Sequence, residues 1–127
     1  MIHSSRPKRP KNLDLFTIHF PLPAIVSILH RIAGVILFFL IPFVLWGLDI
    51  SLTPTGFDTM QQWLSNFYVK FIFLIIFIPF CYHLVAGIRH LLLDIGVGDT
   101  LKGGKRSSQL TLLISAILII WVGIWLW

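Results

Sequence analysis

The sequence predicts an all-α membrane protein with three transmembrane helices, and its composition and apolar patterning carry this prediction. Of its 127 residues, 57% are hydrophobic and only 12% are charged, which is more apolar side chain than a soluble domain of this size can bury. Three apolar stretches are long enough to cross a bilayer core, which takes roughly 20 helical residues. We therefore expect one membrane domain over residues 1–127, with helices at about 22–48, 68–93 and 110–127.

The segments between these stretches are expected to be loops, and their charges predict an orientation. Residues 49–67 have no Lys or Arg, whereas residues 94–109 are basic and rich in glycine. The positive-inside rule places the N-terminus and the second loop in the cytoplasm, and the five tryptophans then form an aromatic belt at the outer end. The net charge of +5 belongs to these loops, and we expect no nucleic-acid partner. The basic residues concerned are Arg6, Lys8, Arg9, Lys11, Arg89, Lys102, Lys105 and Arg106.

The first span carries a polar face near its cytoplasmic end. Ser27, His30, Arg31 and Gly34 lie within an arc of roughly 100°, since each helical residue turns by about 100°. An arginine that snorkels to the headgroups and a serine bonded to its own backbone would explain these residues one at a time. The shared face favours a site for one small acceptor. A quinone carbonyl could accept hydrogen bonds from a hydroxyl and a guanidinium one turn apart, and so could a haem propionate.

The second span carries another polar face, which His83, Gly87, His90 and Asp94 form within an arc of roughly 60°. His83 lies about 15 Å inside the cytoplasmic end, at a rise of about 1.5 Å per residue. It is therefore too deep to be an interfacial residue, and we expect it to bind a ligand rather than only to contact another helix. His90 and Asp94 lie near the interface, where structural, interfacial and propionate-side roles all stay open.

We expect His83 to be a ligand of haem iron. Neutral imidazole is the usual protein ligand of this iron, and b-type haem binds between the helices of a bundle. Gly87 leaves space for the edge of a porphyrin one turn away. His83 and His90 are about 10.5 Å apart on one face and cannot bind the same iron from opposite sides. The second ligand is then His30, at a similar depth, or a residue of another subunit. The single cysteine, Cys81, has no CxxC partner, which excludes covalent c-type haem.

Three stretches resemble the cytochrome b subunit of succinate dehydrogenase, the larger of its two membrane anchors. They are RPKNLDLFTIHFPLPAIVSILHRIAGVIL, YHLVAGIRHLLLDIG and GKRSSQLTLLIS. The S-x-x-H-R-x-x-G and H-x-x-x-G-x-R-H-x-x-x-D patterns are specific together, and the likeness covers nearly the whole chain. The resemblance implies half of a haem-containing membrane-anchor bundle. It also implies a four-part complex. Its two anchor subunits lie in the lipid bilayer, and its other two parts are an iron–sulfur subunit and a flavoprotein subunit.

The resemblance also implies roles for residues at matching positions. Ser27 and Arg31 would line a quinone site, and His83 would be an axial ligand of a haem b that the second anchor subunit shares. His30 and Arg31 would lie near the haem propionates, and we keep His90 as a further candidate for that vicinity. The chain would be a non-autonomous subunit of succinate dehydrogenase that passes electrons from the iron–sulfur subunit to quinone, in the bacterial inner membrane.

Two alternative functions stay open. The chain could anchor a related fumarate reductase, because the direction of the reaction depends on the quinone and on the other subunits. It could also be a non-redox membrane subunit whose polar faces serve contacts between helices.

Overall fold

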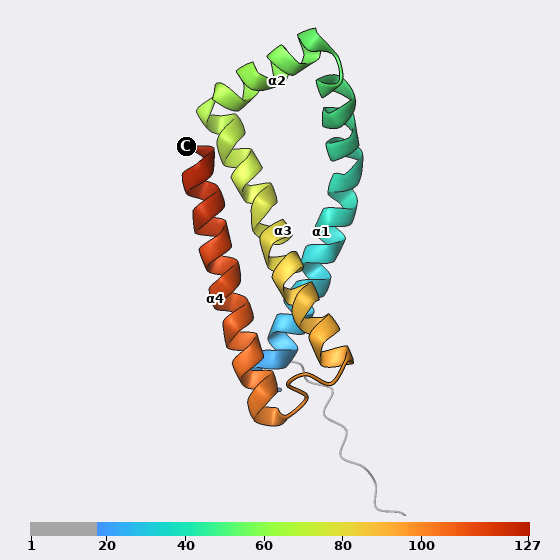
Figure 1. The fold of residues 1–127 in the computed structure, drawn as a ribbon, viewed down its shortest axis with the longest axis vertical. Helices are drawn as coiled ribbons and strands as arrows, with labels where there is room; N and C mark the ends of the chain where they lie inside the picture. The colour runs from blue at the N-terminus through green and yellow to red at the C-terminus, as the bar shows by residue number, and fades with distance from the viewer. Residues whose placement is uncertain (1–17) are drawn as a thin grey trace, which may run out of the picture.

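The computed structural model describes residues 18–127, and this part of the chain forms four helices and no strand. Three of the helices are long and apolar enough to cross a membrane, which confirms the predicted all-α fold with three spans. α2 joins the first two spans at one end of the bundle (Figure 1). The helices are α1 (Leu22–Ser51), α2 (Pro54–Ser65), α3 (Phe67–Asp94) and α4 (Leu101–Leu126).

α2 is a helix where the sequence predicted only a loop. Thr53 caps it, because its hydroxyl oxygen accepts a hydrogen bond from the backbone N–H of Gly56 at 3.1 Å. Pro54 follows in the first turn, where its missing N–H breaks no helical hydrogen bond. None of the residues of α2 is buried. Its apolar residues recur at helical spacing, but they are few and lie among polar and turn residues, which is why the sequence indicated a loop.

α4 begins at Leu101 and not at the predicted residue 110. Gly96 and Gly98 have φ angles of +82° and +80°, which turn the chain out of α3. Thr100 then caps α4 by accepting a hydrogen bond from Gly103 N–H at 2.9 Å. The polar and glycine-rich residues 102–109 indicated a loop. They instead form the first turns of α4, and its apolar part starts later.

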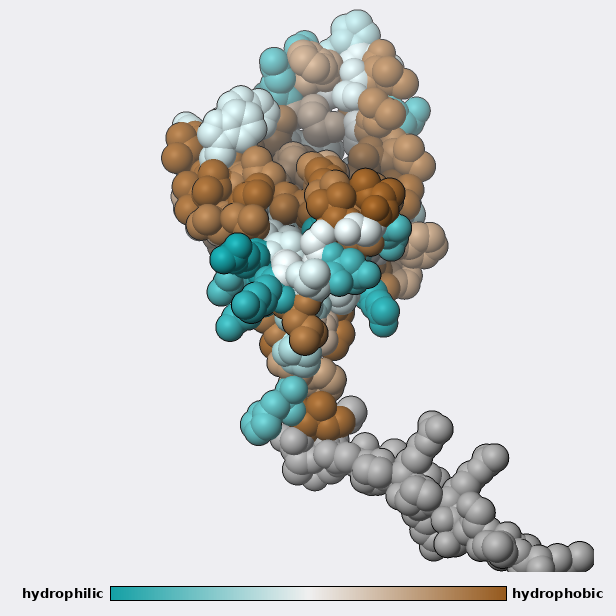
Figure 2. All heavy atoms as spheres, turned by 60° about the horizontal axis from the view of Figure 1, so that its bottom comes forward, coloured by the Kyte–Doolittle hydropathy of each residue, from teal (hydrophilic) through white to brown (hydrophobic). Residues whose placement is uncertain are grey.

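Few residues of the three spans are buried, and most of these are small. Large apolar side chains face outward instead, with Phe38 and Phe39 each 66% exposed. Such surfaces are stable only against lipid or other helices. Figure 2 brings the α3–α4 connection forward and shows hydrophilic side chains gathered around that end. The buried residues are Val26, Ala33, Cys81, Ala86, Arg89, Ser108, Thr111 and Ser115.

α1 and α3 cross in one half of the bundle and separate towards α2 (Figure 1). An apolar pocket of about 510 Å³ lies between their separated halves. Aromatic side chains gather at the α2 end, where the rings of Trp46 and Trp63 lie 6.2 Å apart and Lys70 Nζ lies 5.9 Å from the Trp127 ring. This agrees with a belt at one end of the bundle. The side of the membrane that this end faces stays a prediction.

Candidate functional site

The crossing of α1 and α3 brings His30 and His83 together. Nδ1 of His83 lies 3.1 Å from the backbone carbonyl oxygen of His30. A carbonyl oxygen can only accept, so Nδ1 carries the proton and donates. Nε2 of His83 then carries the lone pair, and within residues 18–127 it makes no hydrogen bond. The arrangement fixes both the tautomer and the direction of the free ring nitrogen.

Three histidine rings form one cluster at this crossing. The His30 and His83 rings are stacked, with centroids 4.2 Å apart and planes 12° from parallel. The His90 ring meets His30 edge-on, at 4.8 Å and 68°. Within residues 18–127, these side chains do not form a group of ligands around one metal ion. The sequence predicted that His30 and His83 lie at similar depth, but it did not predict that their rings stack.

Each helix places a glycine beneath a histidine of the other helix. A Cβ atom at Gly34 would lie 2.9 Å from Cε1 of His83, which is closer than real Cβ contacts. A Cβ atom at Gly87 would lie 3.4 Å from Nε2 of His30. We expected Gly87 to leave space for a porphyrin edge. In this structure the His30 ring lies beside that space, at an ordinary contact distance, so it is Gly34 that allows the helices to approach each other closely at the histidines.

A second hydrogen bond ties α3 to α1 one turn away, and sequence reasoning did not find it. The hydroxyl of Tyr82 donates to the backbone carbonyl of Val26 at 2.8 Å. Tyr82 and His83 are adjacent in α3, while Val26 and His30 are one turn apart in α1. Two neighbouring side chains therefore bond two carbonyls of α1 that lie one turn apart. The only sequence signal was a tyrosine at the apolar centre of a span, where a hydroxyl needs a partner.

The predicted polar face of α1 is divided between two environments. Ser27 is half-buried, and its hydroxyl donates to the carbonyl of Pro23 at 3.0 Å. His30 turns towards α3, whereas Arg31 is exposed on the outside of α1. Arg31 and Asp94 both lie close enough to His90 to interact with it electrostatically. Both side chains are exposed, Arg31 on α1 and Asp94 near the end of α3.

Arg89 does not belong to the exposed basic residues with which the sequence grouped it. Its side chain is only 6% exposed. Its Nε donates to the hydroxyl of Ser107 on α4 at 3.0 Å, and this hydroxyl in turn donates to the Gly104 carbonyl at 3.1 Å. Arg89 is buried because α4 starts early, so that its first turns supply both a wall and a hydrogen-bond partner for this side chain.

The fold and the histidine cluster define a small membrane protein with three spans and a polar site at the crossing of two of them. Residues 5–122 match the family model described as the succinate dehydrogenase/fumarate reductase transmembrane subunit. The chain therefore belongs to this family.

Several relatives carry the name succinate dehydrogenase cytochrome b556 subunit. The one from Coxiella burnetii is 37% identical over 122 residues, which cover 94% of this chain and 98% of the relative. The one from Rickettsia prowazekii is 34% identical, covering 95% of this chain and 94% of the relative. The one from Paracoccus denitrificans is 34% identical, covering 93% and 92%. The likeness thus extends over nearly the full length of each chain.

Proposed function

We propose that the chain is the haem b- and quinone-binding anchor subunit of a succinate:quinone oxidoreductase. The observation that carries this proposal is the hydrogen bond from Nδ1 of His83 to the His30 carbonyl at 3.1 Å. A histidine that binds a metal through one ring nitrogen almost always donates through the other, and this fixes the ring. His83 has that arrangement inside a span, where no water is present to fix it otherwise.

His83 fits the role of an axial ligand of haem b. Its Nε2 carries the lone pair and has no hydrogen bond within residues 18–127, and Gly34 lets the ring lie close against α1. When bound, haem b would supply a centre for one-electron transfer. The contribution of this chain is to hold the imidazole in one tautomer and one orientation. The relatives are named as cytochrome b556 subunits, which supports the assignment.

The second axial ligand is proposed to come from the other anchor subunit and not from His30. The rings of His30 and His83 are stacked at 4.2 Å. Rings stacked at this distance would leave no space between them for a haem, so His30 would not hold the iron together with His83. We place His30 beside a haem propionate instead. Its Nε2 is buried and has no partner among the described residues, so it is available to bond such a group.

The quinone site is proposed to include Ser27 and Arg31. Arg31 is exposed on α1. A guanidinium at this depth needs a partner, and a bound quinone would supply one. The guanidinium would attract the negative charge that a quinone oxygen gains on reduction, and it would also approach a propionate. The Ser27 hydroxyl bonds the Pro23 carbonyl at 3.0 Å and would rotate to donate to a quinone carbonyl. These side chains would bind and orient the substrate.

The proposed setting is a four-part complex in the bacterial inner membrane. The second anchor subunit would cover the exposed apolar faces of the spans. The iron–sulfur and flavoprotein subunits would supply the electrons, so this chain alone would turn over nothing. The family model also covers fumarate reductases. An anchor that works in the reverse direction is therefore the second candidate function.

A spectrum of the purified complex tests the haem assignment. The wild-type complex should give the reduced-minus-oxidised band of haem b, and His83→Ala should remove it. His19→Ala is the matched control, because His19 lies before α1 and is exposed. A wild-type complex without the band would favour the alternative that the chain is a non-redox membrane subunit. A full haem band in His83→Ala would show that another residue binds the iron.

Two variants of the assembled complex test the quinone assignment. Ser27→Ala and Arg31→Leu should slow quinone reduction, while succinate oxidation with an artificial acceptor should be unchanged. If quinone is reduced at the wild-type rate in both variants, these residues do not form the site.

A further inference from the structure

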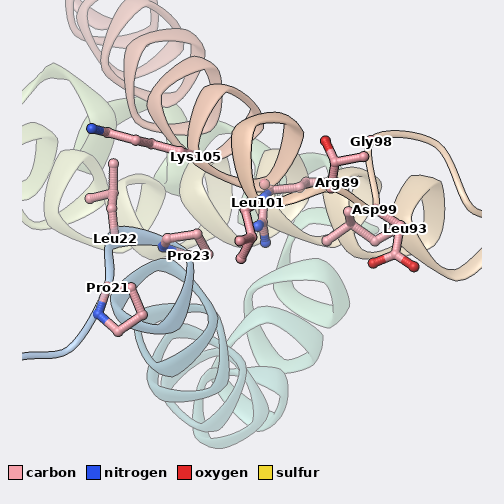
Figure 3. A pocket seen from close by; sticks show the side chains of 11 residues that line it. Pro21, Leu22, Pro23, Arg89, Leu93, Gly98, Asp99, Leu101 and Lys105 are labelled. Atoms are coloured by element: carbon pink, nitrogen blue, oxygen red, sulfur yellow. The ribbon is translucent and has the colours of Figure 1, made fainter.

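A pocket of about 650 Å³ lies at the α3–α4 end of the bundle, outside the histidine cluster. Its wall comes from the start of α1, the end of α3, the connection after Gly98 and the first turns of α4. Pro21 and Pro23, Arg89, Leu93 and Lys105 are among the lining residues, as Figure 3 shows. All of its walls belong to this chain, so the pocket does not depend on a partner to form.

Arg89 lines this pocket with a buried charge that has no counter-ion in the described chain. The side chain is 6% exposed, and Nη1 is buried without a hydrogen-bond partner among residues 18–127. In the view of Figure 3, the guanidinium lies beside the side chain of Leu101, and Pro23 lies on the far side of Leu101. Leaving a buried charge without a partner is strongly unfavourable. An anion in the pocket would remove this penalty.

The other walls of the pocket also suit an anion. Lys105 adds a second cation. The pocket includes Thr100 and Leu101 at the N-terminus of α4, where free N–H groups and the helix dipole favour negative charge. Asp99 is the one acidic residue of the lining. In Figure 3 its carboxylate points away from the guanidinium of Arg89.

The depth of the pocket identifies the source of the anion. α3 has 28 residues, which span about 42 Å at 1.5 Å per residue and exceed a hydrocarbon core of about 30 Å. Arg89 lies about 7.5 Å before the end of α3, and it therefore lies near the boundary between hydrocarbon and headgroups. Leu22 and Leu93 supply apolar walls beside the charges. We propose that this pocket binds the phosphate group of an anionic membrane phospholipid through Arg89, with Lys105 as its second cation.

The test uses the purified complex in detergent, stripped of lipid, with short-chain phosphatidylglycerol as the probe and thermal unfolding as the readout. Arg89→Gln should weaken binding at least about tenfold, because a charge-assisted pair is lost. Lys105→Gln should weaken it less. Lys102→Gln is the matched control, since Lys102 is an exposed cation in the same turn of α4 that does not line the pocket. Binding by this control should equal that of the wild type.

Two further ligands separate the sources of the phosphate. A diacylglycerol with the same chains has no phosphate and should not stabilise the complex, and inorganic phosphate should bind far more weakly than phosphatidylglycerol. If inorganic phosphate binds as tightly, a lipid is the wrong source. Equal binding by the wild type and Arg89→Gln overturns the site. If Arg89→Gln does not assemble, Arg89→Lys is the second variant, because it keeps the charge but lacks the planar guanidinium. It should bind phosphatidylglycerol several-fold more weakly than the wild type. Wild-type affinity in Arg89→Lys would also overturn the proposal.

Discussion

Gly34 on α1 and His83 on α3 occupy adjacent space, and a Cβ atom at the glycine would lie 2.9 Å from Cε1 of the ring. The ring also donates through Nδ1 to the carbonyl of His30, four residues before Gly34. The glycine therefore allows the close approach that the hydrogen bond requires. The position of the His83 ring therefore depends on the absence of a side chain at residue 34.

Gly34→Ala should displace the His83 ring and weaken the hydrogen bond to His30. Overpacking of this kind costs about 1–3 kcal/mol, and the proposed haem should bind less tightly with a shifted spectrum. Haem content and thermal unfolding of the complex measure the effect. Gly47→Ala is the control, because its added Cβ would lie 3.6 Å from the flexible end of Met60. Equal loss of haem in both variants would contradict the specific contact.

Tyr82→Phe should remove the hydrogen bond to the Val26 carbonyl and little else. The Val26 carbonyl keeps its partner within α1, so the expected loss of stability is about 0.5–1.5 kcal/mol. Thermal unfolding of the complex measures it. Tyr68→Phe removes a hydroxyl from an exposed tyrosine of the same helix and should change nothing. A neutral result for Tyr82→Phe would argue against the bond at 2.8 Å.

Thr100→Ala should fray the first turns of α4. Loss of a threonine N-cap typically costs about 1 kcal/mol, and hydrogen exchange should speed up at the amides of residues 103–106. Thr59→Ala is the comparison, since the Thr59 hydroxyl bonds a carbonyl of its own helix and caps nothing. Fast exchange at these amides in the wild type would mean that the helix starts later, as its hydropathy predicted.

Ser108→Leu should separate α4 from the other spans. Ser108 is fully buried, and its hydroxyl bonds the Gly104 carbonyl at 2.8 Å. A larger side chain there costs about 1–3 kcal/mol by overpacking, which should lower the yield of assembled complex. Gln109→Leu adds a similar side chain at an exposed neighbour and should assemble normally. Equal yields would show that this face of α4 is not a packing face.

The sequence predicts the spans well because hydropathy reports whether a helix can lie in lipid. It predicts the start of α4 poorly, because small residues such as Gly104 and Ser108 are typical of loops in water but of close packing between membrane helices. Ser108 is fully buried, and a Cβ atom at Gly104 would lie 3.8 Å from Pro23 of α1. α2 is missed for a different reason, because it is a short helix of 12 residues among turn residues, and Thr53 and Pro54 mark its start.

The candidate site divides in the same way. Helical periodicity predicts that His83 and His90 share one face of α3. The distance of each residue from the end of its own span predicts that His30 and His83 lie at similar depth. Both predictions need only positions along single helices. The stacking of His30 on His83, the bond from Tyr82 and the burial of Arg89 depend on how helices cross. Spacing along one helix contains no information about such crossings.

The acceptor that orients His83 is a main-chain atom, and this has a consequence for evolution. The oxygen belongs to the peptide group of residue 30 and not to its imidazole. Any side chain at position 30 would leave that oxygen in place, provided that α1 kept its path. Inherited variation at position 30 could therefore alter the surroundings of the ring without releasing it. In contrast, a change at Gly34 would disturb the ring without touching either bonded atom.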